Sequence, residues 1–143
     1  MAENSNEHLD ALVDRKLVRL WLYWGLFWLM FTPSIGVTIS SYFNFPGYLG
    51  NSLELQFGRL RPMHVNGVIF GAFSTLFMGL SYYIVPRLTG VKMWHEKIGH
   101  LLMWVWNIGL VIGMVSLLMG YNQGLEAGEF PVLVDTIFFI VIS

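Results

Sequence analysis

Three long apolar segments constrain this chain more than any other feature of its sequence. They cover about 18–41, 62–85 and 98–119, and a shorter apolar stretch covers 132–143. As helices that rise about 1.5 Å per residue, the three long segments would each cross a hydrocarbon core of about 30 Å. Because 55% of the residues are apolar and only 12% are charged, too few charges are available to cover a soluble globule. We therefore predict an all-α membrane protein, folded as a transmembrane helix bundle.

Prolines predict where these helices begin, bend and end. Pro33 lies inside the first segment and predicts a kink, since neighbouring helices can satisfy the carbonyl that it frees. The stretch 42–58 is predicted to be a loop, and Pro62 suits the first turn of the second helix. Pro86 is expected to end that helix.

The last apolar stretch, 132–143, is about half as long as a transmembrane helix. A helix that ends in mid-membrane would leave its last carbonyls unpaired, at a cost of several kcal/mol for each unsatisfied group. We therefore expect the natural polypeptide to continue into further spans. The alternative is that this stretch packs against a partner.

The distribution of basic residues predicts the orientation in the membrane. Residues 1–17 are polar and lack the apolar region and cleavage site of a signal peptide, so we predict a retained cytoplasmic lead-in before the transmembrane region 18–143. Arg59 and Arg61 are predicted on the outer side, where the rule disfavours them. The other basic residues all lie on the predicted cytoplasmic side, and they are Arg15, Lys16, Arg19, Arg87, Lys92 and Lys97.

Charge and composition exclude several kinds of site. The net charge of −1 gives no basic field, so nucleic acid is not an expected partner. The absence of cysteine excludes disulfides, thiolate zinc sites and iron–sulfur clusters. Any metal must therefore be bound by histidine, methionine, tyrosine or carboxylate side chains.

His64 stands apart from the other three histidines. His8 lies in the lead-in, and His95 and His100 lie at the cytoplasmic start of the third segment, where we expect them to be interfacial. His64 is predicted about one turn inside an apolar helix, where an ionisable side chain is costly and is often functional. The alternative is an interfacial histidine that bonds to a neighbouring backbone carbonyl.

Small residues share the predicted helix face of His64. A flat macrocycle that lies against a helix needs an absence of side chains beside its ligand, so Gly67 and Gly71 suit a haem. The alternative is close helix packing through the same pair, which forms a G-x-x-x-G pattern. On helical spacing the face consists of His64, Gly67, Val68, Gly71, Thr75, Met78 and Tyr82.

Charged residues on the predicted outer side suggest further contacts. Arg59 and Arg61 could pair with haem propionates through charge-assisted hydrogen bonds, or extend to lipid headgroups. The carboxylates of Glu126, Glu129 and Asp135 could bind calcium, pair with these arginines, or only solvate a loop.

Four runs of this sequence resemble the catalytic subunit of the cbb3-type cytochrome c oxidases, the C family of haem-copper oxidases. In that family the pattern R-L-R-P-x-H-x-N opens the second helix, and its histidine is an axial ligand of the low-spin haem b. The resemblance gives this role to His64. The runs are FGRLRPMHVNGVIF at 57–70, SYYIVPRLTG at 81–90, WVWNIGLVIG at 104–113 and GYNQGLEAGEFP at 120–131.

The resemblance implies the N-terminal part of subunit I of a terminal oxidase in the bacterial inner membrane. The implied reaction is reduction of dioxygen to water coupled to proton pumping, with the rest of subunit I, c-type cytochrome subunits and the lipid bilayer as partners. The high-spin haem, the copper and the second low-spin ligand would belong to later parts of the subunit, so this fragment alone is not expected to be active.

Two other interpretations remain. The large subunit of bacterial nitric oxide reductase has the same architecture and a related histidine motif, although the intact R-L-R-P favours the oxidase. A small structural membrane subunit could use the same fold without haem.

Overall fold

The computed structural model describes residues 8–49, 52–125 and 128–142, and these ranges contain helices and loops but no strand. Within them, three helical rods are long and apolar enough to cross a membrane. The second rod is continuous from Phe57 to Thr89 and contains three elements. In chain order the elements are α2 (Arg15–Asn44), α3 (Phe57–Asn66), the π-helical segment η1 (Gly67–Ser74), α4 (Thr75–Thr89), α5 (Glu96–Leu118) and α6 (Val132–Ile142).

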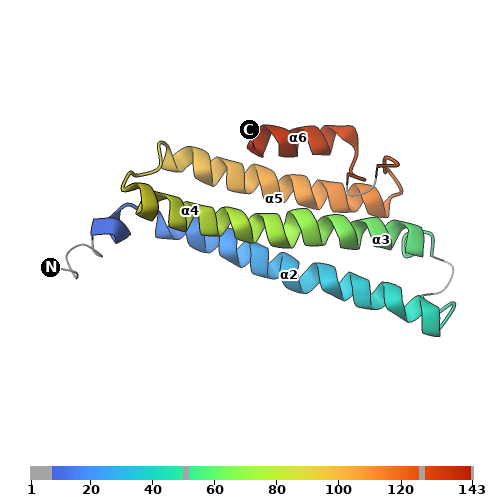
Figure 1. Ribbon diagram of the computed structural model, residues 1–143. Coiled ribbons are helices and arrows are strands. Elements are labelled where there is room, and N and C mark those ends of the chain that lie inside the picture. Colours follow the sequence, from blue (N-terminus) through green and yellow to red (C-terminus); the bar gives the residue numbers. More distant parts are fainter. Residues whose placement is uncertain (1–7, 50–51, 126–127, 143) are drawn as a thin grey trace.

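The helices lie side by side, each antiparallel to the next (Figure 1). Helix α2 packs along the rod formed by α3, η1 and α4, while α5 packs against the same rod and α6 packs against α5. The start of α2, the end of α4 and the start of α5 meet at one end of the bundle (Figure 1). The start of α3 lies at the opposite end.

The second rod extends beyond both of the prolines that were predicted to bound it. Helix α3 begins at Phe57, more than one turn before Pro62, and α4 continues for about one turn beyond Pro86. A proline removes one hydrogen bond, and a helix packed along its length tolerates that loss. Gly90 ends the rod instead, with a left-handed φ of 69° and an N–H that bonds the Pro86 carbonyl at 3.0 Å. Helix α2 continues through Pro33.

The π-helical segment η1 changes which side chains of the second rod share a face. Its hydrogen bonds reach one residue further back than those of an α-helix, so side chains do not keep the α-helical spacing through it. Gly71 packs against Trp28 of α2, whereas Thr75, which α-helical spacing puts on the same face, bonds to Trp106 of α5. The single face predicted from Gly67 to Tyr82 is therefore divided between two neighbouring helices.

Aromatic side chains join η1, α5 and α6. The rings of Trp106 and Phe138 lie 4.7 Å apart between centroids, and those of Phe70 and Phe138 lie 5.5 Å apart. A Cβ on Gly113 would lie 2.7 Å from the ring of Phe130, so the glycine makes room for that ring. Phe130, Phe138 and Trp106 are buried, which fixes α6 against α5.

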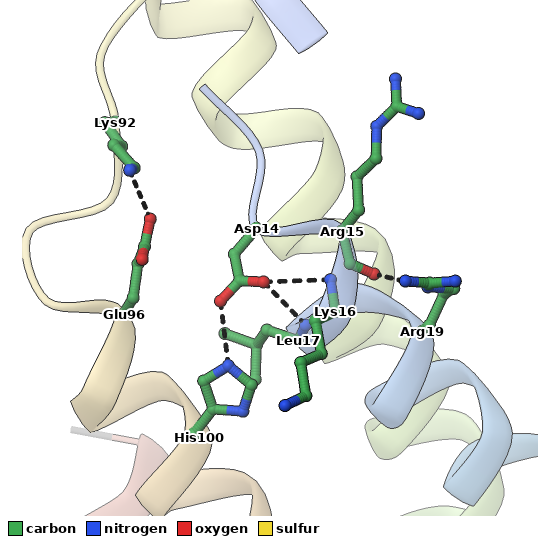
Figure 2. A network of polar contacts seen from close by, with 8 residues as sticks. All are labelled: Asp14, Arg15, Lys16, Leu17, Arg19, Lys92, Glu96 and His100. Carbon is green, nitrogen blue, oxygen red and sulfur yellow. Dashed lines mark hydrogen bonds and ion pairs between the residues drawn. The ribbon is translucent and has the colours of Figure 1, made fainter. Parts of the chain in front are cut away.

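A network of polar contacts connects the start of α2 to α5 (Figure 2). Asp14 caps α2, since its carboxylate accepts the backbone N–H groups of Lys16 and Leu17, each at 3.0 Å. The same carboxylate lies 2.9 Å from Nε2 of His100 on α5. His100, expected to be interfacial, is thus half-buried and joins two helices.

Other ion pairs at this end are more exposed. Asp10 pairs with Arg15 at 2.7 Å and with Arg87 at the end of α4, and Lys92 pairs with Glu96 at 2.6 Å. Figure 2 shows the Lys92–Glu96 pair. Exposed pairs of this kind contribute about 0–1 kcal/mol each. The partly buried cap at Asp14 is therefore the stronger connection at this end.

We predict that Asp14→Ala lowers the stability of the full-length protein by about 1 kcal/mol at neutral pH, because it removes the cap. Burial raises the pKa of Asp14, but the hydrogen bonds from Leu17 and His100 outweigh it, so the pKa lies below its ordinary value. A lowered folded-state pKa means that the stabilisation is present above the unfolded value of about 3.9 and is lost as the pH falls through the folded value.

Thermal unfolding in detergent, followed by circular dichroism across this pH range, measures the difference between Asp14→Ala and the unaltered protein. Lys97→Ala, at an exposed position near the same end, is the control. Equal unfolding temperatures for Asp14→Ala and the unaltered protein at pH 7 would contradict the assignment.

Candidate functional site

The His64 imidazole lies between α3 and α2. Because α3 begins at Phe57, His64 lies about two turns inside the helix rather than one, and it is half-buried. Its Nδ1 is 2.8 Å from the backbone carbonyl oxygen of Thr32. A carbonyl oxygen only accepts hydrogen bonds, so Nδ1 must carry the hydrogen and donate it. In the neutral ring this leaves the lone pair of Nε2 available to bind a metal.

The ring also packs tightly against a glycine of α2. A Cβ placed on Gly36 would lie 2.6 Å from Cε1 of His64, 2.9 Å from Nδ1 and 3.1 Å from Nε2. No side chain fits there. In an α-helix the N–H of residue 36 bonds to the carbonyl of residue 32, so the imidazole lies over one hydrogen-bonded turn of α2.

The bond to a carbonyl agrees with both interpretations of His64. An interfacial histidine would make it, and so would a metal ligand, since ligating histidines usually donate their other N–H to a carbonyl or carboxylate. The ring uses Nδ1 for this bond, and in the part of the chain that the structure describes Nε2 has no hydrogen bond. The same part contains no group of three or more histidines and carboxylates able to hold a metal ion. His64 is therefore suited to be a single axial ligand.

Arg59 and Arg61 connect the start of α3 to other elements. Arg59 Nη1 donates to the Leu118 carbonyl at 2.8 Å, in the last turn of α5, where helix carbonyls lack intrahelical partners. Arg61 Nη1 lies 3.6 Å from the Glu129 carboxylate, and 45% of its side chain is exposed. Because it precedes His64 by three residues, Arg61 shares the face of the imidazole.

Glu129 lies at the centre of a buried polar group near the start of α3. It is 7% exposed, and its carboxylate accepts a hydrogen bond from Nδ2 of Asn66 as well as pairing with Arg61. Nδ2 of Asn66 also donates to the Pro62 carbonyl at 2.8 Å. Pairing with an arginine was one of the three fates predicted for this carboxylate.

Calcium binding was one of the three possibilities for the outer carboxylates. Asp135 accepts a hydrogen bond from Gln123, and the Glu129 carboxylate accepts one from Asn66 and pairs with Arg61. Glu126, the third candidate ligand, lies outside the described residues. We do not assign a calcium site.

Gly67 and Gly71 contact other helices. A Cβ on Gly67 would lie 2.3 Å from Thr32 and 2.5 Å from Met114, and one on Gly71 would lie 3.0 Å from Trp28. The space beside both glycines is filled by side chains of α2 and α5. These contacts are the close helix packing that the G-x-x-x-G pattern left open as an alternative, and a role beside a porphyrin stays a prediction.

Thr32 and Gly36 could not be identified from the sequence. Neither lies near His64 in the chain, and neither side chain has ligand chemistry. They come beside His64 through the packing of α2 against α3, which a single sequence does not specify.

Comparisons with known proteins identify the family of this chain. A family model described as cytochrome c and quinol oxidase polypeptide I matches residues 16–143. The cbb3-type cytochrome c oxidase subunit CcoN1 of Stutzerimonas stutzeri is 29% identical over 137 residues, which cover 95% of this chain and 29% of that protein. Cytochrome c oxidase subunit 1 of Rhodobacter capsulatus is 28% identical over 142 residues, covering 96% of this chain and 26% of that protein.

A third relative, a cytochrome c oxidase subunit 1 homolog of Agrobacterium tumefaciens, is 27% identical over 123 residues, covering 86% of this chain and 22% of that protein. The chain thus spans less than a third of the length of each of these relatives. The family is built as a transmembrane helix bundle, which confirms the predicted fold class, and its members are oxidoreductases. With residues 16–143 matched, the chain belongs to the cytochrome c and quinol oxidase polypeptide I family.

Proposed function

We propose that this chain supplies one axial ligand, His64, to a low-spin haem b in subunit I of a cbb3-type cytochrome c oxidase. The observation that carries the proposal is that, in a chain of this oxidase family, the histidine of the R-L-R-P-x-H-x-N run donates from Nδ1 to the Thr32 carbonyl and so leaves Nε2 for iron. Haem, when bound, supplies one-electron redox chemistry. The parent enzyme would reduce dioxygen to water and pump protons in the bacterial inner membrane, with electrons delivered by c-type cytochrome subunits.

The second axial ligand has to come from outside the described part of the chain. His100 bonds to Asp14 at the start of α2, and His95 precedes the first turn of α5 at the same end of the bundle. His64 lies towards the opposite end, with the start of α3 (Figure 1). These histidines therefore cannot share one haem with His64, and the proposal requires further spans of the oxidase subunit.

We propose that the guanidinium groups of Arg61 and Arg59 bind haem propionates. The position of Arg61 on the face of His64 and its partial exposure support it as the principal contact. Arg59 already donates a hydrogen bond to the Leu118 carbonyl at the end of α5, so it would contribute mainly its positive charge. The high-spin haem and copper of the parent enzyme would be held by other parts of the subunit. The relatives named above are all cytochrome c oxidase subunits, which favours this reading over nitric oxide reductase.

We further propose that the N-terminal end of the bundle faces the cytoplasm. The start of α2, the end of α4, the loop that follows it and the start of α5 meet at this end, and together they hold six of the eight basic residues (Figure 1).

The first prediction here concerns His64. In the full-length enzyme, His64→Ala should abolish the low-spin haem b band in reduced-minus-oxidised spectra of membranes, because iron loses an axial nitrogen. His95→Ala is the matched control, since this exposed histidine lies at the other end of the bundle. A normal low-spin band in His64→Ala would refute the proposed function.

The second prediction concerns Arg61. Removal of a positive charge near the haem favours the ferric state, so Arg61→Gln should lower the haem b midpoint potential by tens of millivolts. Lys97→Gln, a basic residue at the opposite end, should leave the potential unchanged in the same redox titration. If both variants keep the unaltered potential, Arg61 does not act on the haem.

The third prediction tests the orientation. The chain has no cysteine, so a single introduced cysteine reports without background from this sequence. In intact cells, an impermeant thiol reagent should label Leu53→Cys and should reach Thr89→Cys only after permeabilisation. Both positions are exposed. The reverse labelling pattern would invert the proposed topology.

A further inference from the structure

We infer that Thr32 and Gly36 of α2 are positioning residues for the haem ligand: the Thr32 carbonyl fixes the tautomer of His64, and Gly36 fixes where its ring lies. The inference deepens the proposed function and rests on it. It assigns to α2 an influence on the midpoint potential of the haem, in addition to its role in helix packing.

The first step concerns the proton. With Nδ1 donating to the Thr32 carbonyl at 2.8 Å, the neutral ring has one tautomer, and its unprotonated nitrogen is Nε2. A hydrogen bond of this kind makes a ligating imidazole more basic, because it draws the Nδ1 proton partly away. A more basic ligand stabilises ferric iron. Weakening the bond should therefore raise the midpoint potential.

The second step concerns the ring position. A Cβ on Gly36 would come within 3.1 Å of both nitrogens and Cε1 of the ring, closer than unbonded atoms normally approach. The backbone of α2 cannot easily yield, since Thr32, one turn before Gly36, is fully buried and packs directly against Gly67 of the second rod. An added methyl group must therefore displace the imidazole, moving Nδ1 away from the carbonyl and redirecting Nε2.

Gly36 lies at the point of the contact between α2 and the second rod where the His64 ring needs space. At the two neighbouring contacts along α2 the rod supplies the glycine and α2 supplies the larger side chain, whereas further along α2 supplies Gly25 to Leu76 of the rod. At His64 the arrangement is reversed: α2 supplies the glycine, Gly36, and the imidazole of the second rod fills the space beside it. The contacting pairs are Trp28 with Gly71, Thr32 with Gly67, and Gly36 with His64.

The experiment uses Gly36→Ala in the full-length enzyme, with haem b content, midpoint potential and the g values of the low-spin haem as readouts. We expect a higher potential and altered g values. Gly58→Ala is a matched control on α3, where an added Cβ meets nothing within 4 Å. Gly25→Ala is a steric control on α2, since its Cβ would lie 2.6 Å from Leu76, away from His64. Both controls should keep the potential and the g values of the unaltered enzyme.

If Gly36→Ala keeps the unaltered potential and g values, or if Gly25→Ala shifts them equally, the glycine only packs helices and the inference is wrong. Loss of the haem band in His64→Ala together with that result would remove the inference and keep the proposed function. A retained band in His64→Ala would remove both.

A second variant tests the carbonyl even if Gly36→Ala does not assemble. In His64→Gly, added imidazole can bind iron and donate to Thr32, whereas 1-methylimidazole can bind iron but has no N–H to donate. We expect imidazole to restore the low-spin band at a concentration about tenfold lower than 1-methylimidazole, the factor for about 1.4 kcal/mol, within the range of a single hydrogen bond. Equal restoration by both ligands would show that the carbonyl does not hold the ring.

Discussion

Hydrocarbon offers no hydrogen-bond partner, so several polar side chains between the helices bond to one another or to backbone carbonyls. Trp28 Nε1 of α2 donates to Asn107 of α5 at 2.9 Å. Trp106 Nε1 of α5 donates to Thr75 of α4 at 3.1 Å. His64 bonds to the backbone of α2. These directional bonds fix the rotation of each helix about its own axis, which apolar contacts alone specify poorly, and the position of the candidate ligand depends on that rotation.

The stability of the bundle comes mainly from close packing. Hydrogen bonds between membrane helices average about 0.6 kcal/mol, so the few bonds between these helices cannot hold them together alone. Glycines let the backbones approach instead: an added Cβ on Gly25 would lie 2.6 Å from Leu76, and one on Gly79 would lie 3.0 Å from Trp21. Packing therefore supplies most of the stabilising free energy of the bundle, while the hydrogen bonds determine the rotation of each helix about its own axis.

The apolar pattern was sufficient to predict the long helices, because a membrane-spanning backbone must satisfy its own hydrogen bonds. The helix ends were predicted less well, since Pro62 and Pro86 each remove one bond from a helix that packing maintains. The π-helical segment could not be predicted, because its register depends on bonds to another helix. For the site, the motif indicated His64, but Gly36 reached it only through the tertiary contact of α2.

The face that His64 shares with Gly67 and Gly71 packs against α2. Trp28, Thr32 and Gly36 recur at every fourth residue of α2 and so form one ridge, which meets Gly71, Gly67 and His64 of the second rod. Gly67 and Gly71 bring this ridge close enough for a backbone carbonyl to reach the imidazole. A haem bound at Nε2 would thus owe its ligand geometry to the same glycines, acting through helix packing.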